Sequence, residues 1–168
     1  RPAKAGGALA GLKVLDLAWV VAGPMVGRNL ADHGATVLRV ESSRRIEAGR
    51  NSGPYKDGVY DPALSALFQN CNAGKRGLCL DLTQEAGRAV VRDLVKWADL
   101  VVESFAPGRM DAWGLGYDVL REINPEIILL SSSLNHCHLC CRRGWSAPKI
   151  AACAYNLCKC CAAVFAVK

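Results

Sequence analysis

The chain of 168 residues has no acidic residue after Glu126, although it contains 15 Asp and Glu residues in all. Sixteen of its 21 Lys and Arg residues also lie at or before that point, so residues 1–134 are almost neutral. The net charge of +6 comes mainly from the last part of the chain. A nearly neutral domain offers no basic face for a polyanion, so we expect no nucleic-acid partner.

The sequence also lacks an apolar run of the roughly 18–20 residues that a membrane-spanning helix requires. Asp16 interrupts the first long apolar stretch, and Asn156 and Lys159 interrupt the last. The chain begins with Arg1 and shows no signal-peptide pattern, and we interpret residues 1–8 (RPAKAGGA) as a linker. We expect a cytoplasmic location and no membrane partner.

Cysteine is scarce before residue 135, where only Cys71 and Cys79 occur, whereas seven cysteines crowd the last 32 residues. Residues 135–168 also lack acids and any sustained periodicity, which predicts an irregular, cysteine-rich tail that does not continue the preceding domain. Our favoured hypothesis is that this tail results from a shifted reading frame. Translation of the encoding DNA in its other two frames is then expected to recover a continuation similar to Gly-Gln-Thr-Gly-Pro.

A zinc-binding module is the alternative interpretation of the tail. Cys137-x2-Cys140 and Cys158-x2-Cys161 have zinc-ribbon spacing, and His136 and His138 add further candidate ligands. The Gly and Pro residues that usually shape metal-binding turns are missing, and the surplus of cysteines allows many competing pairings. We therefore assign no metal ligands.

Apolar runs separated by turn signals predict alternating strands and helices in residues 9–134. Such alternation is typical of an α/β fold with a doubly wound, Rossmann-like parallel sheet and flanking helices, here truncated.

In one helix, Ala86, Val90, Leu94 and Trp97 form the predicted buried face, with Thr83 as its N-cap. The last strand is predicted to be an exposed edge. The predicted strands are 14–21, 36–41, 78–82, 99–103 and 127–131, and the main helices are 25–33, 86–97 and 117–123.

Ligands of open α/β sheets bind beyond the carboxyl ends of the strands. We expect four segments to converge there: residues 20–24, 41–45, 70–77 and 103–109. Glycines in these segments let the backbone approach a ligand, and their Lys and Arg residues offer positive charge to phosphates.

Several motifs occur in the same order and at similar separations in a known family. Residues 9–134 resemble the N-terminal part of family III (CaiB/BaiF-type) CoA-transferases, which include formyl-CoA transferase, carnitine CoA-transferase and α-methylacyl-CoA racemase. The motifs are LAGLKVLDL (9–17), VAGP (21–24), LADHGATVLRVE (30–41), NAGKRGL (72–78), ADLVVESFAPG (98–108), GLGY (114–117) and INP (123–125).

This resemblance implies that the chain binds coenzyme A and acts on acyl-CoA and carboxylic acid substrates, in enzymes that form interlocked homodimers. Such enzymes move CoA between carboxylates through an aspartyl thioester. The chain has no Asp after Asp118, where the family carries its nucleophile, so we assign no catalytic residue and expect an inactive fragment. The candidate CoA-binding residues are Val21, Ala22, Gly23, Asn72, Lys75, Arg76, Ser104, Phe105 and Arg109.

A Rossmann dinucleotide-binding module remains an alternative. Glu41 closes the second predicted strand about 20 residues after a glycine turn, as an acidic residue does in that module. However, Gly23-x3-Gly27 does not match G-x-G-x-x-G, and Pro24 occupies the tight-turn position. Titration with CoA and with NAD separates the two hypotheses.

Overall fold

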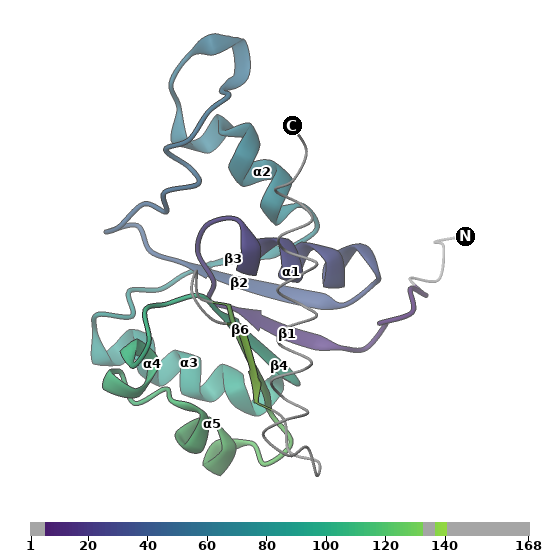
Figure 1. Cartoon of the computed structure of the whole chain (residues 1–168), viewed down its shortest axis with the longest axis vertical. Helices are drawn as coiled ribbons and strands as arrows, with labels where there is room; N and C mark the ends of the chain where they lie inside the picture. Colours follow the sequence, from purple (N-terminus) through teal and green to yellow (C-terminus); the bar gives the residue numbers. More distant parts are fainter. Residues whose placement is uncertain (1–5, 133–136, 141–168) are drawn as a thin grey trace.

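The computed structural model describes residues 6–132 and 137–140. Six strands form one sheet in the order β3-β2-β1-β4-β5-β6 (Figure 1). The first five strands are parallel, and β6 pairs with β5 in the antiparallel direction. The α/β class with a Rossmann-like parallel sheet is therefore confirmed. The strands are β1 (Lys13–Asp16), β2 (Thr36–Glu41), β3 (Arg76–Cys79), β4 (Leu100–Glu103), β5 (Ile128–Ser132) and β6 (Cys137–Cys140).

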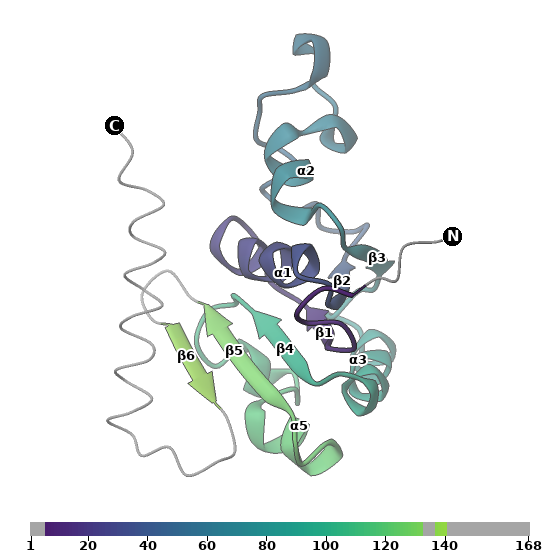
Figure 2. The ribbon, with the colours of Figure 1, turned by 90° about the vertical axis from the view of Figure 1, so that its right-hand side faces the viewer.

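Helices cover both faces of this sheet. On one face lies α1 (Ala22–Asp32), with α2 (Ala66–Asn72) packed beside it, and three further α-helices lie on the opposite face (Figures 1 and 2). The chain runs outward from β1 through β2 to β3 and then returns to place β4 on the other side of β1. The β1–β4 boundary is therefore the topological switch point, where such sheets bind ligands. The opposite face carries α3 (Glu85–Trp97), α4 (Arg109–Ala112) and α5 (Tyr117–Ile123).

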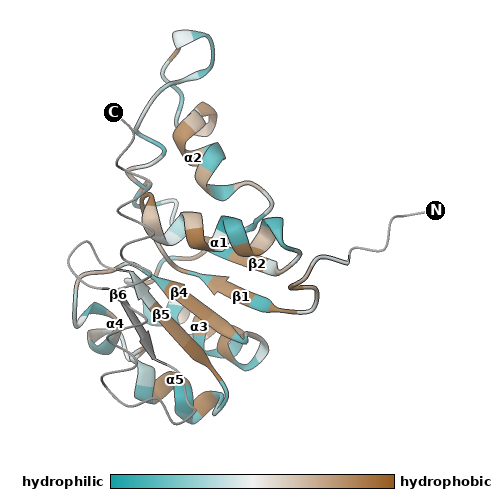
Figure 3. Ribbon diagram, turned by 45° about the vertical axis from the view of Figure 1, so that its right-hand side comes forward, coloured by the Kyte–Doolittle hydropathy of each residue, from teal (hydrophilic) through white to brown (hydrophobic). Residues whose placement is uncertain are grey.

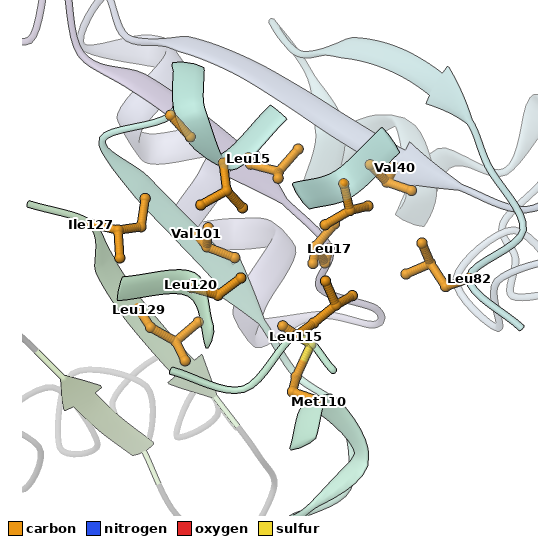
Figure 4. Packing of buried hydrophobic residues seen from close by; sticks show 13 residues of the cluster. Leu15, Leu17, Val40, Leu82, Val101, Met110, Leu115, Leu120, Ile127 and Leu129 are labelled. Atoms are coloured by element: carbon orange, nitrogen blue, oxygen red, sulfur yellow. The ribbon is translucent and has the colours of Figure 1, made fainter. Parts of the chain in front are cut away.

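Alternating side chains of the central strands fill two apolar cores. Val14 and Val102 belong to the core under α1, whereas Leu15 and Val101 belong to the core under α3 and α5. Figure 4 shows part of the second core, and Figure 3 shows that the hydrophobic residues concentrate in the central strands. Burial on both faces explains why these strands read as continuous apolar runs in the sequence.

The first strand is shorter than the predicted run 14–21. The carboxylate of Asp16 accepts the N–H of Ala18 (3.0 Å), and Val20 has a left-handed φ of 49°. A strand cannot continue through a residue in that conformation, so the chain turns out of the sheet after Asp16. The turn brings residues 17–21 to the carboxyl edge of the sheet.

The predicted buried face of the third helix is partly wrong. Leu94 and Trp97 pack against the core as expected, but Val90 is 40% exposed. The fully buried residues of α3 are Gly87, Val91 and Val95. A Cβ atom on Gly87 would lie 2.2 Å from the carbonyl oxygen of Asp81, so only glycine lets the helix pack this closely against the preceding turn. That close approach sets the rotation of the helix.

The predicted N-cap of α3 is also wrong, because Gln84 is the N-cap and makes no side-chain capping bond. Thr83 instead lies in the turn before the helix, where its N–H and its hydroxyl both donate to Asp81.

The tail that was expected to be irregular contributes β6, so the prediction of an exposed edge at residues 127–132 is wrong. The strand pairs along β5 from Ser132 to Leu129 and satisfies backbone groups that an edge would leave open. Residues 1–5, 133–136 and 141–168 lie outside the described part of the structure. The proposed linker, the zinc hypothesis and the shifted reading frame all fall wholly or largely on them.

None of the helices in the described residues is long and apolar enough to cross a membrane.

Candidate ligand-binding cleft

A cleft of about 750 Å³ opens at the carboxyl edge of the sheet, on the face that carries α3 and α4. Its lining combines apolar, aromatic and polar or charged residues. The apolar residues are Leu17, Val40, Leu80, Leu82 and Ala106. The aromatic residues are Trp19, Phe105 and Trp113, and the polar and charged residues are Glu41, Ser42, Arg44, Arg45, Asp81, Thr83, Ser104 and Arg109.

Arginine and aromatic side chains pair around this cleft. The guanidinium of Arg45 lies 5.3 Å from the ring centroid of Trp19, and that of Arg109 lies 5.6 Å from Trp113. Phe105 meets Trp113 edge to face at 5.1 Å. Stacking of this kind orients a guanidinium and leaves its N–H donors free for an anion. The cleft therefore offers both flat apolar surfaces and directed positive charge.

Ser104 joins the two sides of the switch point. Its hydroxyl oxygen accepts the N–H of Trp19 and its hydroxyl proton is donated to the carbonyl oxygen of Trp19, both at 2.8 Å. A cleft wall from the residues after β1 is thereby tied to the end of β4. The hydroxyl is consequently engaged in holding the backbone of Trp19.

Asp81 supplies an acceptor in the wall of the cleft. Its Oδ1 atom accepts from the N–H (2.9 Å) and the hydroxyl (2.6 Å) of Thr83, and these bonds lower the pKa of the Asp81 carboxyl below its ordinary value. Its Oδ2 atom is buried and accepts no hydrogen bond from the described residues, with the Nε atom of Arg44 3.8 Å away. A ligand hydroxyl or amine could supply the missing donor.

Four charged side chains lie buried on the α1 face of the same edge, and we call them the buried network. They are Asp16, Arg39, Glu47 and Lys75. The ammonium of Lys75 donates to Asp16 Oδ2 (2.6 Å), to the carbonyl oxygen of Pro24 (2.7 Å) and to Asn72 Oδ1 (2.8 Å). An ammonium has three donors, so Lys75 has none left for a ligand.

The other half of the buried network centres on Arg39. Its Nη1 atom donates to the carbonyl oxygen of Ala18 (2.8 Å) and approaches Asp16 at 3.5 Å, and its Nη2 atom forms an ion pair with Glu47. Burial lowers the pKa of Lys75, and the negative charge of Asp16 opposes that effect. Two cations and two anions share the space, so the buried network is electrically balanced.

The structure divides the nine residues that the sequence singled out. Ser104, Phe105 and Arg109 line the cleft. Val21 and Asn72 line a separate small cavity of about 10 Å³, and Asn72 also accepts from Lys75.

The remaining predicted residues lie around the start of α1 and the outer strand. Ala22 begins α1, and a Cβ atom on Gly23 would lie 2.4 Å from that of Ala18, so the helix packs closely against the turn after β1. Lys75 belongs to the buried network, and Arg76 is exposed at the start of β3.

Sequence reasoning missed Trp19, Trp113 and residues 80–83 as lining residues of the cleft. Residues 80–83 were assigned to the third strand and to a helix cap, but β3 already ends at Cys79. Ligands are expected beyond the carboxyl end of β3 as they are beyond β1, β2 and β4. With the correct end of β3, this rule would have identified residues 80–83 as lining residues.

Among the residues that the structure describes, no three His, Cys, Asp or Glu side chains are grouped so that they could hold a metal ion.

The chain is similar to a set of related proteins. Residues 9–134 match the model of CoA-transferase family III. An acyl-CoA transferase from Fusarium pseudograminearum is 42% identical over 135 residues, covering 73% of this chain and 28% of that protein. Succinyl-CoA:mesaconate CoA-transferase from Haloarcula hispanica is 42% identical over 125 residues, covering 74% of this chain and 31% of the relative.

A solved structure shares the fold as well as the sequence. The CAIB/BAIF family protein from Brucella suis superposes with a TM-score of 0.66 and 43% sequence identity, covering 74% of this chain and 33% of that one. The chain thus spans about a third of the length of the relatives that it matches.

Proposed function

This chain belongs to CoA-transferase family III, and we propose that it forms the CoA-binding part of an enzyme that transfers CoA between carboxylic acids. The observation that carries the proposal is the cleft at the switch point, in which exposed arginines surround apolar and aromatic surfaces.

The chemistry of CoA matches that lining. Its adenine presents a flat apolar face to aromatic rings, and its phosphates accept directed hydrogen bonds from guanidinium groups. Arg44, Arg45 and Arg109 line the cleft together with Trp19 and Phe105. The open Oδ2 acceptor of Asp81 suits a hydroxyl or amine of the nucleoside.

We propose that Ser104, Phe105 and Arg109 border the bound CoA directly. Asn72 and Lys75 have their polar atoms engaged with each other and with neighbouring groups, so we assign them a supporting role through the buried network. Val21, Ala22 and Gly23 place the start of α1 against the same turn. Arg76 is exposed at the start of β3 and is the weakest member of the predicted set.

A dinucleotide is a poorer match for this cleft. Both carboxylate oxygens of Glu41 accept from Arg50, at 2.7 and 3.1 Å, so a ribose hydroxyl would have to share Glu41 with this ion pair. Calorimetric titration of the 168-residue chain with CoA and, separately, with NADH tests the proposal. Binding of CoA but not NADH is expected, and binding of NADH without CoA would overturn it.

We further propose that the chain binds CoA without transferring it. The acids in its cleft are Glu41 and Asp81, which are held by Arg50 and Thr83, and no Asp follows Asp118. Incubation with an acyl-CoA and mass spectrometry of the intact chain should show no added mass. A thioester trapped on a side chain would contradict this expectation.

For the complete protein we propose carboxylic acids and their CoA thioesters as substrates, a cytoplasmic location and an interlocked homodimer. Sedimentation of the full-length protein tests the proposed dimer. A protein that sediments as a monomer would contradict this proposal.

A further inference from the structure

Glu47 is a buried carboxylate that links two walls of the cleft, although it does not line the cleft itself. It is 4% exposed and lies in the long segment between β2 and α2. Its Oε1 atom accepts the N–H of Val20 (2.8 Å), and its Oε2 atom pairs with Arg39 of β2. One carboxylate thus connects the turn after β1, the middle of the sheet and the segment that follows β2.

The turn that Glu47 holds has an unfavourable backbone conformation. Val20 has a φ of 49°, which is costly for a β-branched residue, and the residue is 41% exposed, so its burial does little to compensate. Hydrogen bonds hold the turn on both sides instead. The N–H of Trp19 bonds to Ser104, and the N–H of Val20 bonds to Glu47.

The segment that carries Glu47 also carries arginines of the cleft. Arg44 and Arg45 precede it by three and two residues, and the guanidinium of Arg45 lies over the ring of Trp19. Glu47 therefore lies two residues from Arg45 in the chain and bonds to the residue that follows Trp19.

We propose that Glu47 is a positioning residue for CoA binding, which acts by holding the Val20 turn in its left-handed conformation and the Arg44–Arg45 segment beside it. This inference rests on the proposed CoA-binding function. A preformed site binds more tightly because ligand binding does not have to order it.

The substitution Glu47→Gln tests the role of Glu47. A glutamine places an NH2 group, which only donates, where one of the two carboxylate oxygens accepts, so either Arg39 or the N–H of Val20 loses its acceptor. Calorimetry of the 168-residue chain should show about tenfold weaker CoA binding, the factor expected for one charge-assisted hydrogen bond. The matched control is Val95→Ala, a destabilising change in the core under α3 that leaves the turn intact and should leave the affinity unchanged.

The double variant Val20→Gly/Glu47→Gln separates positioning from general stability. Glycine adopts positive φ without a steric cost, so the turn then depends less on Glu47. In the Val20→Gly background, Glu47→Gln should weaken CoA binding by only about threefold or less, compared with about tenfold in the parent. The difference between the two losses is the coupling expected for about one hydrogen bond between the residues. Equal losses in both backgrounds would overturn the proposal.

Hydrogen exchange of the Val20 amide provides a readout that needs neither CoA nor a stable variant. In the unsubstituted chain this amide should be protected from exchange, despite its place in a surface turn, because Glu47 accepts its proton. Exchange as fast as in an open loop would overturn the positioning role. Failure of the unsubstituted chain to bind CoA, with a protected Val20 amide, would instead refute the proposed function alone.

Discussion

The two faces of the sheet's carboxyl edge use the same residue types for different purposes. On the α1 face, Arg39 and Lys75 are buried and donate to neighbouring carboxylates and carbonyl oxygens. On the α3 face, the Arg44 side chain is 76% exposed, and Arg45 lies over an aromatic ring. A cation is therefore available to a ligand only where its neighbours leave donors free, and residue type alone does not reveal this.

The largest difference between the two faces should appear on removal of Lys75. The Lys75 side chain is only 2% exposed, so Lys75→Met leaves the carboxylate of Asp16 buried with a weakened set of partners. Breaking a buried pair in this way costs roughly 3–5 kcal/mol of unfolding free energy. Urea denaturation followed by circular dichroism measures that loss.

The neighbouring cation provides the control. Arg76 is exposed at the start of β3, so Arg76→Met should change the unfolding free energy by no more than about 0.5 kcal/mol. If Lys75→Met also fell within that range while abolishing CoA binding, Lys75 would be a ligand contact and not a member of a structural network.

A smaller effect is expected from the arginines of the cleft. The variant Arg44→Gln/Arg45→Gln should weaken CoA binding by about tenfold in dilute buffer, and the difference should shrink as salt is added, because exposed charges are screened. Its unfolding free energy should barely change. Calorimetric titration at two salt concentrations measures both the loss and its salt dependence.

The control for this prediction is Arg76→Gln, which removes an arginine outside the cleft and should leave CoA binding unaltered. An equal loss of affinity in the two variants would mean that the whole basic surface attracts CoA and that the cleft has no special role.

The smallest predicted effect concerns Asp81 and Thr83. Thr83→Val removes the hydroxyl that donates to Asp81, so the pKa of the Asp81 carboxyl should rise toward its ordinary value of 3.8. A carboxyl group whose pKa is lower in the folded than in the unfolded chain stabilises the fold at pH values above its unfolded-state pKa. This stabilisation is lost as the pH falls through the folded-state pKa. The variant should therefore be slightly less stable than the parent at neutral pH and equal to it in strong acid. Carboxyl-carbon NMR titration follows the pKa, and an unmoved value would contradict the assignment.

The parallel sheet could be predicted because its strands are buried on both faces and read as apolar runs between turn signals. The strand over residues 36–41 and the helix over 117–123 agree with the structure residue for residue. The end of β1 could not be predicted, because it depends on Asp16 bonding within its own turn and on the left-handed Val20. The rotation of α3 depends on a close approach of Gly87 to the carbonyl of Asp81, which no periodicity encodes.

The candidate site was predictable in its location but only partly in its members. The carboxyl edge follows from the topology, and Ser104, Phe105 and Arg109 lie there as expected. Lys75 looked equally suitable in the sequence, since basic residues after a glycine turn often meet phosphates. Its engagement with Asp16 depends on contacts between residues 59 positions apart, which only the folded chain reveals.

The most direct test of the account is amide NMR of the 168-residue chain during titration with CoA. The account predicts that the amide signals of Trp19, Thr83 and Phe105, which line the cleft, shift strongly and saturate together, while those of Asn72 and Arg76 stay nearly still. Shifts centred on residues 72–76, or no saturable shifts at all, would contradict it.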